Sequence, residues 1–310
     1  MTANKPTHPS FIEIVDVSAR DGLQNEDRLF STDEKLALIN RAVDSGLRRI
    51  EVSSFVHPKR VPQMADAEAV IAGLPDRKDV TFIGLTLNER GLDRALETKI
   101  DEVGCVVVAS DGFAMANQGQ TSAESVSVAK AIIKRARAEK LPANVTISTA
   151  FGCPFDGEVP LSRVVDICKA LADSGTREIA IADTIGVGNP WHVTDMVAAI
   201  KDAVPDMPLR AHFHNTRNMA VANVYAAVTA GVVTLDGTIG GIGGCPFAPN
   251  ATGNVALEDV IYMLHRAGVG TGVSLDQIIE TAQWLSGLMA RDLPGMVSKA
   301  GSFPKQDQAS

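Results

Sequence analysis

A (β/α)₈ barrel, an α/β fold, is what this sequence of 310 residues predicts. Eight short runs rich in Val and Ile alternate with longer amphipathic segments, as expected of repeated strand–helix units. A barrel of this kind takes about 250 residues, which the chain can supply within a single domain. The alternative, a doubly wound open sheet, is disfavoured because no G-x-G-x-x-G fingerprint follows the first strand.

The eight predicted strands are short apolar runs bounded by Gly, Pro, Asp or Asn, a pattern typical of buried strands. They begin at Ile12, Arg49, Val80, Glu102, Asn144, Glu178, Leu209 and Val233. Between them, apolar residues three or four positions apart predict helices over residues 32–45, 122–140, 161–173, 190–204 and 219–230. We expect the first of these helices to begin at a cap formed by Ser31 or Thr32 and to end at Gly46.

The domain organisation follows from the spacing of these elements. No segment rich in Pro, Gly or Ser divides the sequence, so residues 1–310 are expected to form one domain. The barrel would span about residues 12–268, and a further helical segment over about 274–295 would pack against it.

Charge and cysteine content disfavour several functional classes. Against 29 Lys and Arg stand 37 Asp and Glu, a formal charge of −8, and a nucleic-acid partner would need dense positive charge. The four cysteines form no C-x-x-C pair, which argues against a thiolate zinc cluster or a disulfide scaffold. No apolar run approaches the roughly 18–20 residues of a membrane span, and the amino terminus resembles no signal or transit peptide. We therefore expect a cytoplasmic protein with no nucleic-acid or membrane partner.

Polar residues at the carboxyl ends of the strands are the candidates for catalysis, because barrels of this kind build their active sites there. Arg20 and Asp21 follow the first predicted strand, and Glu51 interrupts the second. Asp183 ends the sixth strand. Glu51 has two interpretations: a structural ion pair with Arg20, or a carboxylate that the same pairing tunes for catalysis, which we favour.

The pair His212 and His214 is the most specific of these signals. Residues two apart on a strand project from the same face, so both imidazoles should point into the barrel mouth. Two imidazoles are half of a typical divalent-metal site, and Asp21 would supply an oxygen ligand. The alternative is a pair of hydrogen-bonded histidines without a metal.

A glycine-rich stretch over residues 240–254 follows the eighth strand and is expected to form a lid over the mouth. It lacks the G-K-[ST] ending of a phosphate-binding loop. Cys245 within it is either an inert small residue or a reactive thiol that the lid delivers. Composition alone does not distinguish the two.

Several motifs then identify a family resemblance. They are RDGLQNE at 20–26, SFV at 54–56, VPQMAD at 61–66, GCPFDG at 152–157, DTIGVG at 183–188, GGCP at 243–246 and GN at 253–254. In this order and spacing the sequence resembles the 3-hydroxy-3-methylglutaryl-CoA (HMG-CoA) lyases from about residue 12 to residue 290. The agreement of several unrelated motifs makes the resemblance specific.

The resemblance implies a metal-dependent barrel lyase with an acyl-CoA substrate. By position, the metal ligands would be Asp21, His212, His214 and Asn254. Arg20 would stabilise the enolate oxygen of the thioester, and either Glu51 or Asp183 would take the proton of the reacting hydroxyl. Cys245 would return a proton from the lid, and Gln24 would bind substrate. Mg²⁺ or Mn²⁺ is the expected ion, and a homodimer is expected by analogy.

One departure from the family concerns the residues after the second histidine. The family continues with Asp-Thr-Tyr-Gly, whereas this chain has Asn215, Thr216, Arg217 and Asn218. The change makes the mouth more positive by about two charge units, so we expect Arg217 to contact an anionic part of the substrate. The substrate would then be HMG-CoA, as in leucine breakdown, or a relative such as citramalyl-CoA or a longer branched glutaryl-CoA.

Two further functions compete with the lyase. A Claisen-type synthase of the same group is disfavoured because such enzymes usually carry a long carboxyl-terminal regulatory extension, which this sequence lacks. A catalytically silent barrel that serves as a binding protein is disfavoured because every expected ligand and acid is present.

Overall fold

The computed structural model describes residues 9–244 and 253–303. Eight parallel strands pair in sequence order and close into a barrel, so the predicted fold class is confirmed. The strands are β1 (Glu13–Asp16), β2 (Arg49–Ser54), β3 (Thr81–Thr86), β4 (Glu102–Val108), β5 (Ala143–Ser148), β6 (Ile179–Asp183), β7 (Leu209–Phe213) and β8 (Thr234–Gly237). β1 pairs with β8 in the register Glu13 to Thr234, which closes the barrel.

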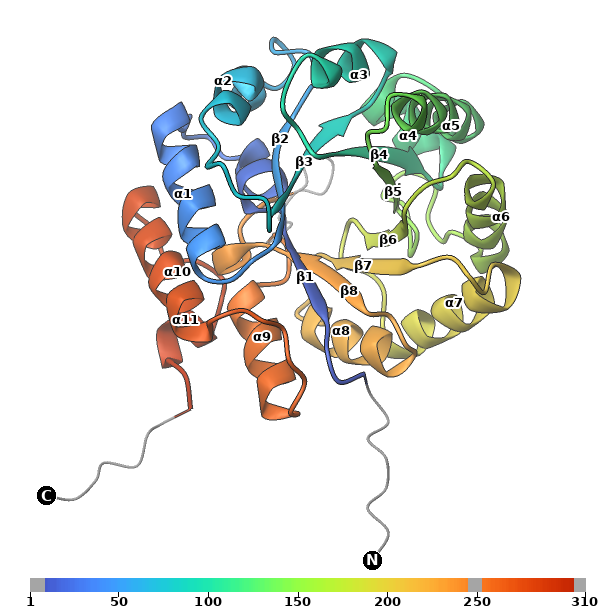
Figure 1. Ribbon diagram of the computed structural model, residues 1–310. Coiled ribbons are helices and arrows are strands. Elements are labelled where there is room, and N and C mark those ends of the chain that lie inside the picture. Colours follow the sequence, from blue (N-terminus) through green and yellow to red (C-terminus); the bar gives the residue numbers. More distant parts are fainter. Residues whose placement is uncertain (1–8, 245–252, 304–310) are drawn as a thin grey trace, which may run out of the picture.

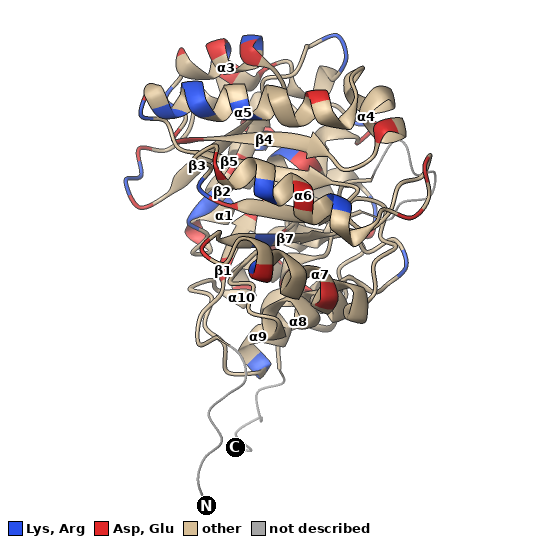
Figure 2. Cartoon of the chain, turned by 90° about the vertical axis from the view of Figure 1, so that its right-hand side faces the viewer, with Lys and Arg blue, Asp and Glu red and all other residues tan. Residues whose placement is uncertain are grey.

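Helices surround the barrel on all sides (Figure 1). They are α1 (Thr32–Asp44), α2 (Ala67–Ala72), α3 (Glu89–Leu96), α4 (Asp111–Gln118), α5 (Ser122–Ala138), α6 (Leu161–Ala172), α7 (Pro190–Ala203), α8 (Ala220–Thr229), α9 (Leu257–Arg266), α10 (Leu275–Met289) and α11 (Val297–Ala300). Their outer faces carry side chains of both charges, interspersed along α5 and α6 (Figure 2). Among the described helices, none has both the length and the hydropathy needed to cross a bilayer.

The longer helices agree with the amphipathic pattern that predicts them. The helix predicted to begin at Ser31 or Thr32 is α1, and Ser31 caps it: its side chain accepts a hydrogen bond from the amide of Glu34, whose carboxylate accepts one from the amide of Ser31. The predicted segments near residues 122, 161, 190 and 219 are α5, α6, α7 and α8. The shorter helices α2, α3 and α4 were not predicted, because six to eight residues are too few to display a clear helical period.

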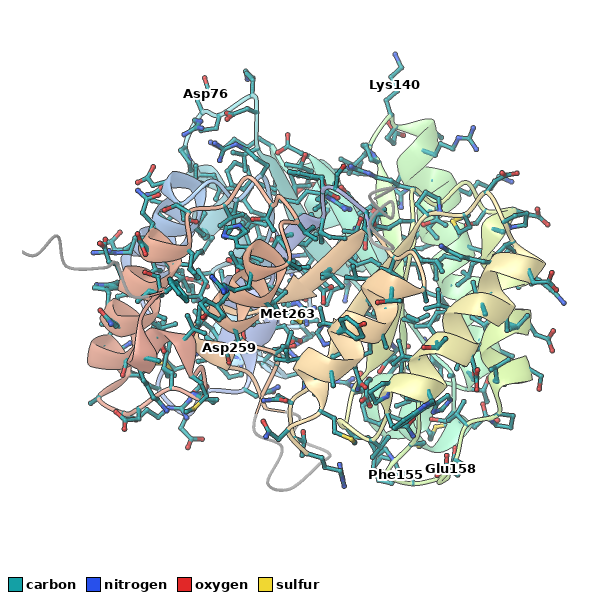
Figure 3. The ribbon with its side chains drawn as sticks, turned by 90° about the horizontal axis from the view of Figure 1, so that it is seen from below. Asp76, Lys140, Phe155, Glu158, Asp259 and Met263 are labelled. Carbon is teal, nitrogen blue, oxygen red and sulfur yellow. The ribbon has the colours of Figure 1, made fainter. Side chains whose placement is uncertain are left out.

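The two ends of the barrel differ in the loops that form them. Asp76 and Lys140 lie in the loops that precede β3 and β5, at the amino ends of the strands. Phe155 and Glu158 lie between β5 and α6, at the carboxyl ends, and Figure 3 shows these pairs on opposite sides of the molecule. Barrels of this kind carry their functional residues at the second end, the barrel mouth.

The inside of the barrel is more ionic than is usual for this fold. The main hydrophobic core lies between the strands and the helices. Among the described residues, a second and smaller cluster of buried apolar side chains consists of Val15, Val17 and Ile83. Branched apolar side chains commonly fill the interior of such barrels. Here charged side chains that are at most 4% exposed lie on or next to the strands, among them Glu51, Arg49, Glu102, Glu178, Arg210 and Asp236.

Candidate active site

A single helical turn, η1 (Ser18–Gly22), places Arg20 and Asp21 in the barrel mouth. The Asp16 carboxylate at the end of β1 accepts a hydrogen bond from the amide of Ser18, and the Ser18 hydroxyl accepts one from the amide of Ile239 beyond β8. Gly22 ends the turn against Ile242, where a Cβ would lie 2.8 Å from side-chain carbons. The turn is thus fixed on both sides.

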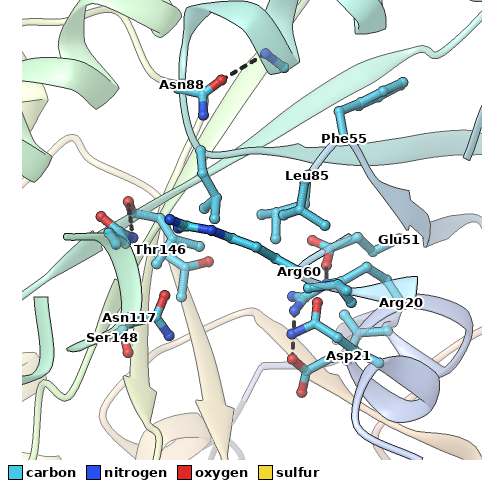
Figure 4. Close-up of a pocket in the computed structure, with 18 of the residues that line it drawn as sticks. Arg20, Asp21, Glu51, Phe55, Arg60, Leu85, Asn88, Asn117, Thr146 and Ser148 are labelled. Carbon is cyan, nitrogen blue, oxygen red and sulfur yellow. Dashed lines mark hydrogen bonds and ion pairs between the residues drawn. The ribbon is translucent and has the colours of Figure 1, made fainter. Parts of the chain in front are cut away.

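Arg20 joins two carboxylates of the mouth. Its Nη1 lies 2.6 Å from Oδ1 of Asp21, and its Nε donates to Glu51 on β2 (Figure 4). Glu51 is 3% exposed, so its charge needs this partner. The ion pair anticipated from the sequence is present, and it lies in the mouth itself.

Asp21, His212 and His214 form the one group of His, Cys, Asp and Glu side chains in the described chain that is close enough to hold a metal ion. One potential ligand atom from each lies within 4.8 Å of the others. Nε2 of His214 is 4.0 Å from Oδ2 of Asp21, and the two imidazole rings lie 5.0 Å apart. Asn254 joins the group by donating from Nδ2 to Oδ2 of Asp21 at 2.8 Å. The structure therefore brings all four expected ligands together.

The charges of this group suit cation binding near neutral pH. Burial and the charge of His212 lower the pKa of His214 to about 4, so this ring is neutral. Burial opposes ionisation of Asp21, but Arg20 and both imidazoles outweigh it and hold the pKa of Asp21 below its usual range. Burial likewise opposes charging of His212, but the Asp236 carboxylate raises the pKa of that ring. The site thus offers a carboxylate and at least one neutral imidazole.

Two buried polar atoms at this site have no hydrogen-bond partner: Nδ1 of His214 and Oδ1 of Asn254. Asn254 is 1% exposed, and buried polar atoms without partners are uncommon in folded proteins. A divalent cation among these side chains would give the Asn254 oxygen the partner that it lacks. The donor set of one carboxylate, two imidazoles and one amide oxygen fits Mg²⁺ or Mn²⁺.

A cavity of about 1320 Å³ opens above this group. It is lined by the Arg20–Glu51 pair, Asp21, both histidines and Gln24, which the sequence assigned to substrate binding. Its other walls carry Phe55, Arg60, Leu85, Asn117, Thr146 and Ser148 (Figure 4). The volume is large enough for an extended thioester substrate.

Asp183 and Arg217 lie away from the cavity lining. Ala182 and Thr184 line the cavity, whereas the Asp183 carboxylate accepts hydrogen bonds from the amides of Val187 and Gly188, each at 2.9 Å. Burial raises the pKa of Asp183, although these hydrogen bonds oppose the shift. Arg217 donates from Nη1 to the carbonyls of Ile185 and Gly186, at 2.9 and 3.1 Å. Both side chains therefore bind the loop over residues 185–188.

Cys245 lies outside the described residues. The described residues next to it reach the metal-type group, that is, Asp21, His212, His214 and Asn254. Gly243 packs against Asp21 and Asn254 with a φ of +98°. A Cβ added at this position would lie 2.7 Å from Nδ2 of Asn254. Gly244 lines the cavity, and its carbonyl accepts a hydrogen bond from Asn25 at 2.7 Å. The glycine-rich stretch therefore starts at the rim of the mouth.

Two charged residues of the cavity floor, Arg210 and Asp236, were not predicted. Asp236 forms a 2.6 Å hydrogen bond to Nδ1 of His212, and Arg210 lies beside it. The sequence carries a signal for both. Asp236 interrupts an apolar strand as Glu51 does, and Arg210 shares a strand face with His212 and His214.

Comparison with known proteins adds a family match. The family model described as HMGL-like matches residues 11–285. The chain is 38% identical over 287 residues to a hydroxymethylglutaryl-CoA lyase of Bacillus subtilis, with 93% of this chain and 96% of the relative covered. It is 41% identical over 300 residues to an (R)-citramalyl-CoA lyase of Chloroflexus aurantiacus, with 94% and 95% covered.

Solved structures agree with these matches. The crystal structure of the B. subtilis HMG-CoA lyase superposes with a TM-score of 0.92 at 37% identity, covering 94% of this chain and 98% of that one. An HMG-CoA lyase from Acinetobacter baumannii, in complex with coenzyme A and 3-methylmalate, gives a TM-score of 0.90 at 36% identity, covering 98% and 100%.

Proposed function

The chain belongs to the HMGL-like family, and from this membership we propose that it is a divalent-metal-dependent carbon–carbon lyase that cleaves HMG-CoA to acetyl-CoA and acetoacetate. The observation that carries the proposal is the junction of two groups in one mouth. The Asp21–His212–His214–Asn254 group and the Arg20–Glu51 pair line a single cavity and share the contact between Arg20 and Asp21.

The reaction makes three demands on the site. The tertiary hydroxyl must lose its proton, the neighbouring carbon–carbon bond must break as a ketone forms, and the bonding electrons must move into the thioester as an enolate. The enolate then takes up one proton to give acetyl-CoA. A base, a positive charge near the thioester oxygen and an acid are therefore required.

Glu51 is the base that the geometry supports better. It lines the cavity and is held by Arg20, whereas the Asp183 carboxylate is held by backbone amides outside the cavity lining. Arg20 faces the same cavity with a partly buried guanidinium, suited to meet the negative charge that develops on the thioester oxygen. Cys245 is proposed as the proton donor from its place in the sequence beside Gly244.

A bound divalent ion would polarise the hydroxyl and carboxylate oxygens of the substrate and favour loss of the hydroxyl proton. Asp21, His212, His214 and Asn254 would hold it. Two imidazoles favour Mn²⁺ over Mg²⁺ more than an all-oxygen site would, so we propose that the site binds Mn²⁺ more tightly than Mg²⁺.

The test is a direct assay of product formation. The purified protein is assayed separately with HMG-CoA, citramalyl-CoA and a longer branched glutaryl-CoA. Each assay contains Mn²⁺ or Mg²⁺ in excess over the protein. Release of acetyl-CoA and acetoacetate from HMG-CoA at the highest kcat/KM supports the proposal. A higher kcat/KM for citramalyl-CoA would favour the second candidate, for which the 41% identical relative is the supporting observation. No cleavage of any ester would overturn both.

The proposal extends to the state of the protein in the cell. We propose a homodimer, which light scattering of the purified protein would check. We also propose a cytoplasmic location, which fractionation of cells that express the protein would check.

A further inference from the structure

A column of alternating buried charges connects the amino end of the barrel with the histidine pair. It starts at Glu102, whose Oε1 lies 2.7 Å from Nη2 of Arg49. The same Nη2 lies 2.5 Å from Oε1 of Glu178, which lies 3.4 Å from Nη1 of Arg210. The column continues from Arg210 to Asp236, with 3.3 Å between Nε and Oδ2, and thus reaches His212. Stability does not explain such a column, because apolar side chains would fill the same space with a smaller desolvation penalty.

The last contact of the column determines which nitrogen of His212 is free. Oδ1 of Asp236 lies 2.6 Å from Nδ1 of His212, and a carboxylate can only accept a hydrogen bond there. The ring must therefore carry a proton on Nδ1. In the neutral ring, Nε2 then holds the lone pair, and it is the nitrogen available to Asp21 and His214.

Arg210 limits the movement of the Asp236 carboxylate on its other side. Arg210 is 1% exposed, and its Nη2 donates a hydrogen bond to Oδ1 of Asn144 at 2.9 Å, so it is itself held in place. Asp236 is 4% exposed and has one oxygen toward His212 and the other toward Arg210. If the Asp236 carboxylate turned away from the imidazole, it would also move away from the Arg210 guanidinium and leave two buried charges without their partners.

We propose that Asp236 is a positioning residue of the metal site, held by Arg210, which fixes His212 in the orientation and tautomer that present Nε2 to a divalent cation. A carboxylate behind a metal-binding imidazole fixes the ring and increases its basicity, and its loss typically weakens metal binding by about 10- to 100-fold. The inference rests on the metal-binding part of the proposed function and not on the identity of the acyl-CoA.

Metal affinity without substrate provides the first test. Isothermal titration of Mn²⁺ into Asp236→Asn should give a Kd about 10- to 100-fold weaker than that of the unmodified protein. Glu102→Gln is the matched control, since Glu102 is equally buried and ion-paired but lies at the far end of the column. It should lower thermal stability and leave the Mn²⁺ Kd within about twofold, a change smaller than a tenfold step of affinity. Equal Mn²⁺ affinities for Asp236→Asn and the unmodified protein would overturn the inference.

Nitrogen-15 NMR of the metal-free, unmodified protein provides the second test and needs no variant to fold. At pH 9, above the ordinary range of imidazole titration, the His212 ring should carry its proton on Nδ1. The signal is assigned by its loss in His212→Gln. A proton on Nε2 would overturn the inference. Failure of the unmodified protein to bind Mn²⁺ would instead count against the proposed function, so the two failures are distinguishable.

Discussion

The side-chain amide of Asn254 donates a 2.8 Å hydrogen bond to Oδ2 of Asp21, across 233 positions of sequence. This contact joins the turn after β1 to the chain beyond β8, the two strands that close the barrel. His214 pairs with Asn254 through a backbone bridge, so β7 is tied to the same point. The group of Asp21, His212, His214 and Asn254 is therefore built from the same segments that close the barrel. A variant that weakens the contact between Asp21 and Asn254 should therefore be tested both for stability and for metal binding.

Removal of one imidazole should abolish metal binding and catalysis together. His212→Ala deletes one of three side chains whose ligand atoms lie within 4.8 Å of one another, and leaves Asp236 without its partner. We expect elemental analysis to find less than one tenth of the metal content of the unmodified protein, a loss of at least about 1.4 kcal/mol in binding. His265→Ala, a histidine outside the mouth that bonds to Thr271, is the control. Full metal occupancy in His212→Ala would refute the ligand assignment.

Arg20 should separate catalysis from metal binding. Arg20→Met removes the positive charge that faces the cavity, so kcat for acyl-CoA cleavage should fall by about 10²- to 10³-fold. The Mn²⁺ Kd should not weaken, because a cation near Asp21 repels a second cation. Steady-state kinetics and calorimetry on the same preparation check both statements. A parallel loss of kcat and Mn²⁺ affinity would show that Arg20 serves mainly to hold Asp21 in place.

The strand period explains which parts of the site could be predicted from the sequence. His212 and His214 are two apart on β7 and both reach the mouth, as the alternation of side chains requires. The same alternation places Asp183 on the opposite face from Ala182, which lines the cavity. The face that Asp183 occupies therefore follows from the period of the strand, whereas a place at a strand end does not by itself show that a side chain lines the mouth.

Other features depend on distances that no local pattern encodes. The ion pair between Arg20 and Glu51 can be considered from the sequence because a carboxylate buried inside a strand needs a partner. The column from Glu102 through Arg49, Glu178 and Arg210 to Asp236 instead joins residues that are far apart in the sequence. Charged residues near strand starts look like solvent-exposed termini in a sequence. Only closure of the barrel turns them toward one another and buries them.

Glu258 should make stability depend on pH. Burial raises the pKa of its carboxyl from the ordinary 4.5 to about 7, while one oxygen accepts a hydrogen bond from the amide of Gly240 at 3.0 Å. Because the folded state holds the proton more tightly than the unfolded state, this stabilisation is complete below pH 4.5 and is lost as pH rises to about 7. The loss amounts to about 3 kcal/mol. Glu258→Gln cannot ionise, so its free energy of unfolding should rise relative to the unmodified protein over this range.

Urea unfolding at several pH values from 5 to 8, the usual range of maximal stability at about pH 5–8, measures this difference. Glu280→Gln, at an exposed position on α10, is the control and should follow the unmodified protein at every pH. Parallel curves for Glu258→Gln and the unmodified protein would show that the Glu258 carboxyl does not hold a proton in the folded state.

Arg217 should influence substrate preference through the loop that it holds. Its two hydrogen bonds to the carbonyls of Ile185 and Gly186 fix a loop that begins next to Thr184, a residue of the cavity wall. Arg217→Tyr combined with Asn215→Asp restores the family pattern at both positions. We expect kcat/KM for HMG-CoA to rise relative to citramalyl-CoA and the longer branched ester in this variant. An unchanged ranking of the three esters would show that the departure is incidental.

Cys245 should act as the acid that protonates the enolate. It follows Gly244, which lines the cavity and whose carbonyl accepts a hydrogen bond from Asn25 at the rim. Cys245→Ala should then keep the Mn²⁺ Kd and the substrate KM and lower kcat by about 10²- to 10⁴-fold. Cys245→Ser should rescue little, because a hydroxyl is a far weaker acid than a thiol with a pKa of about 8.5. Near-normal turnover in both variants would mean that the residue only packs within its loop, and the proton would have to come from another group.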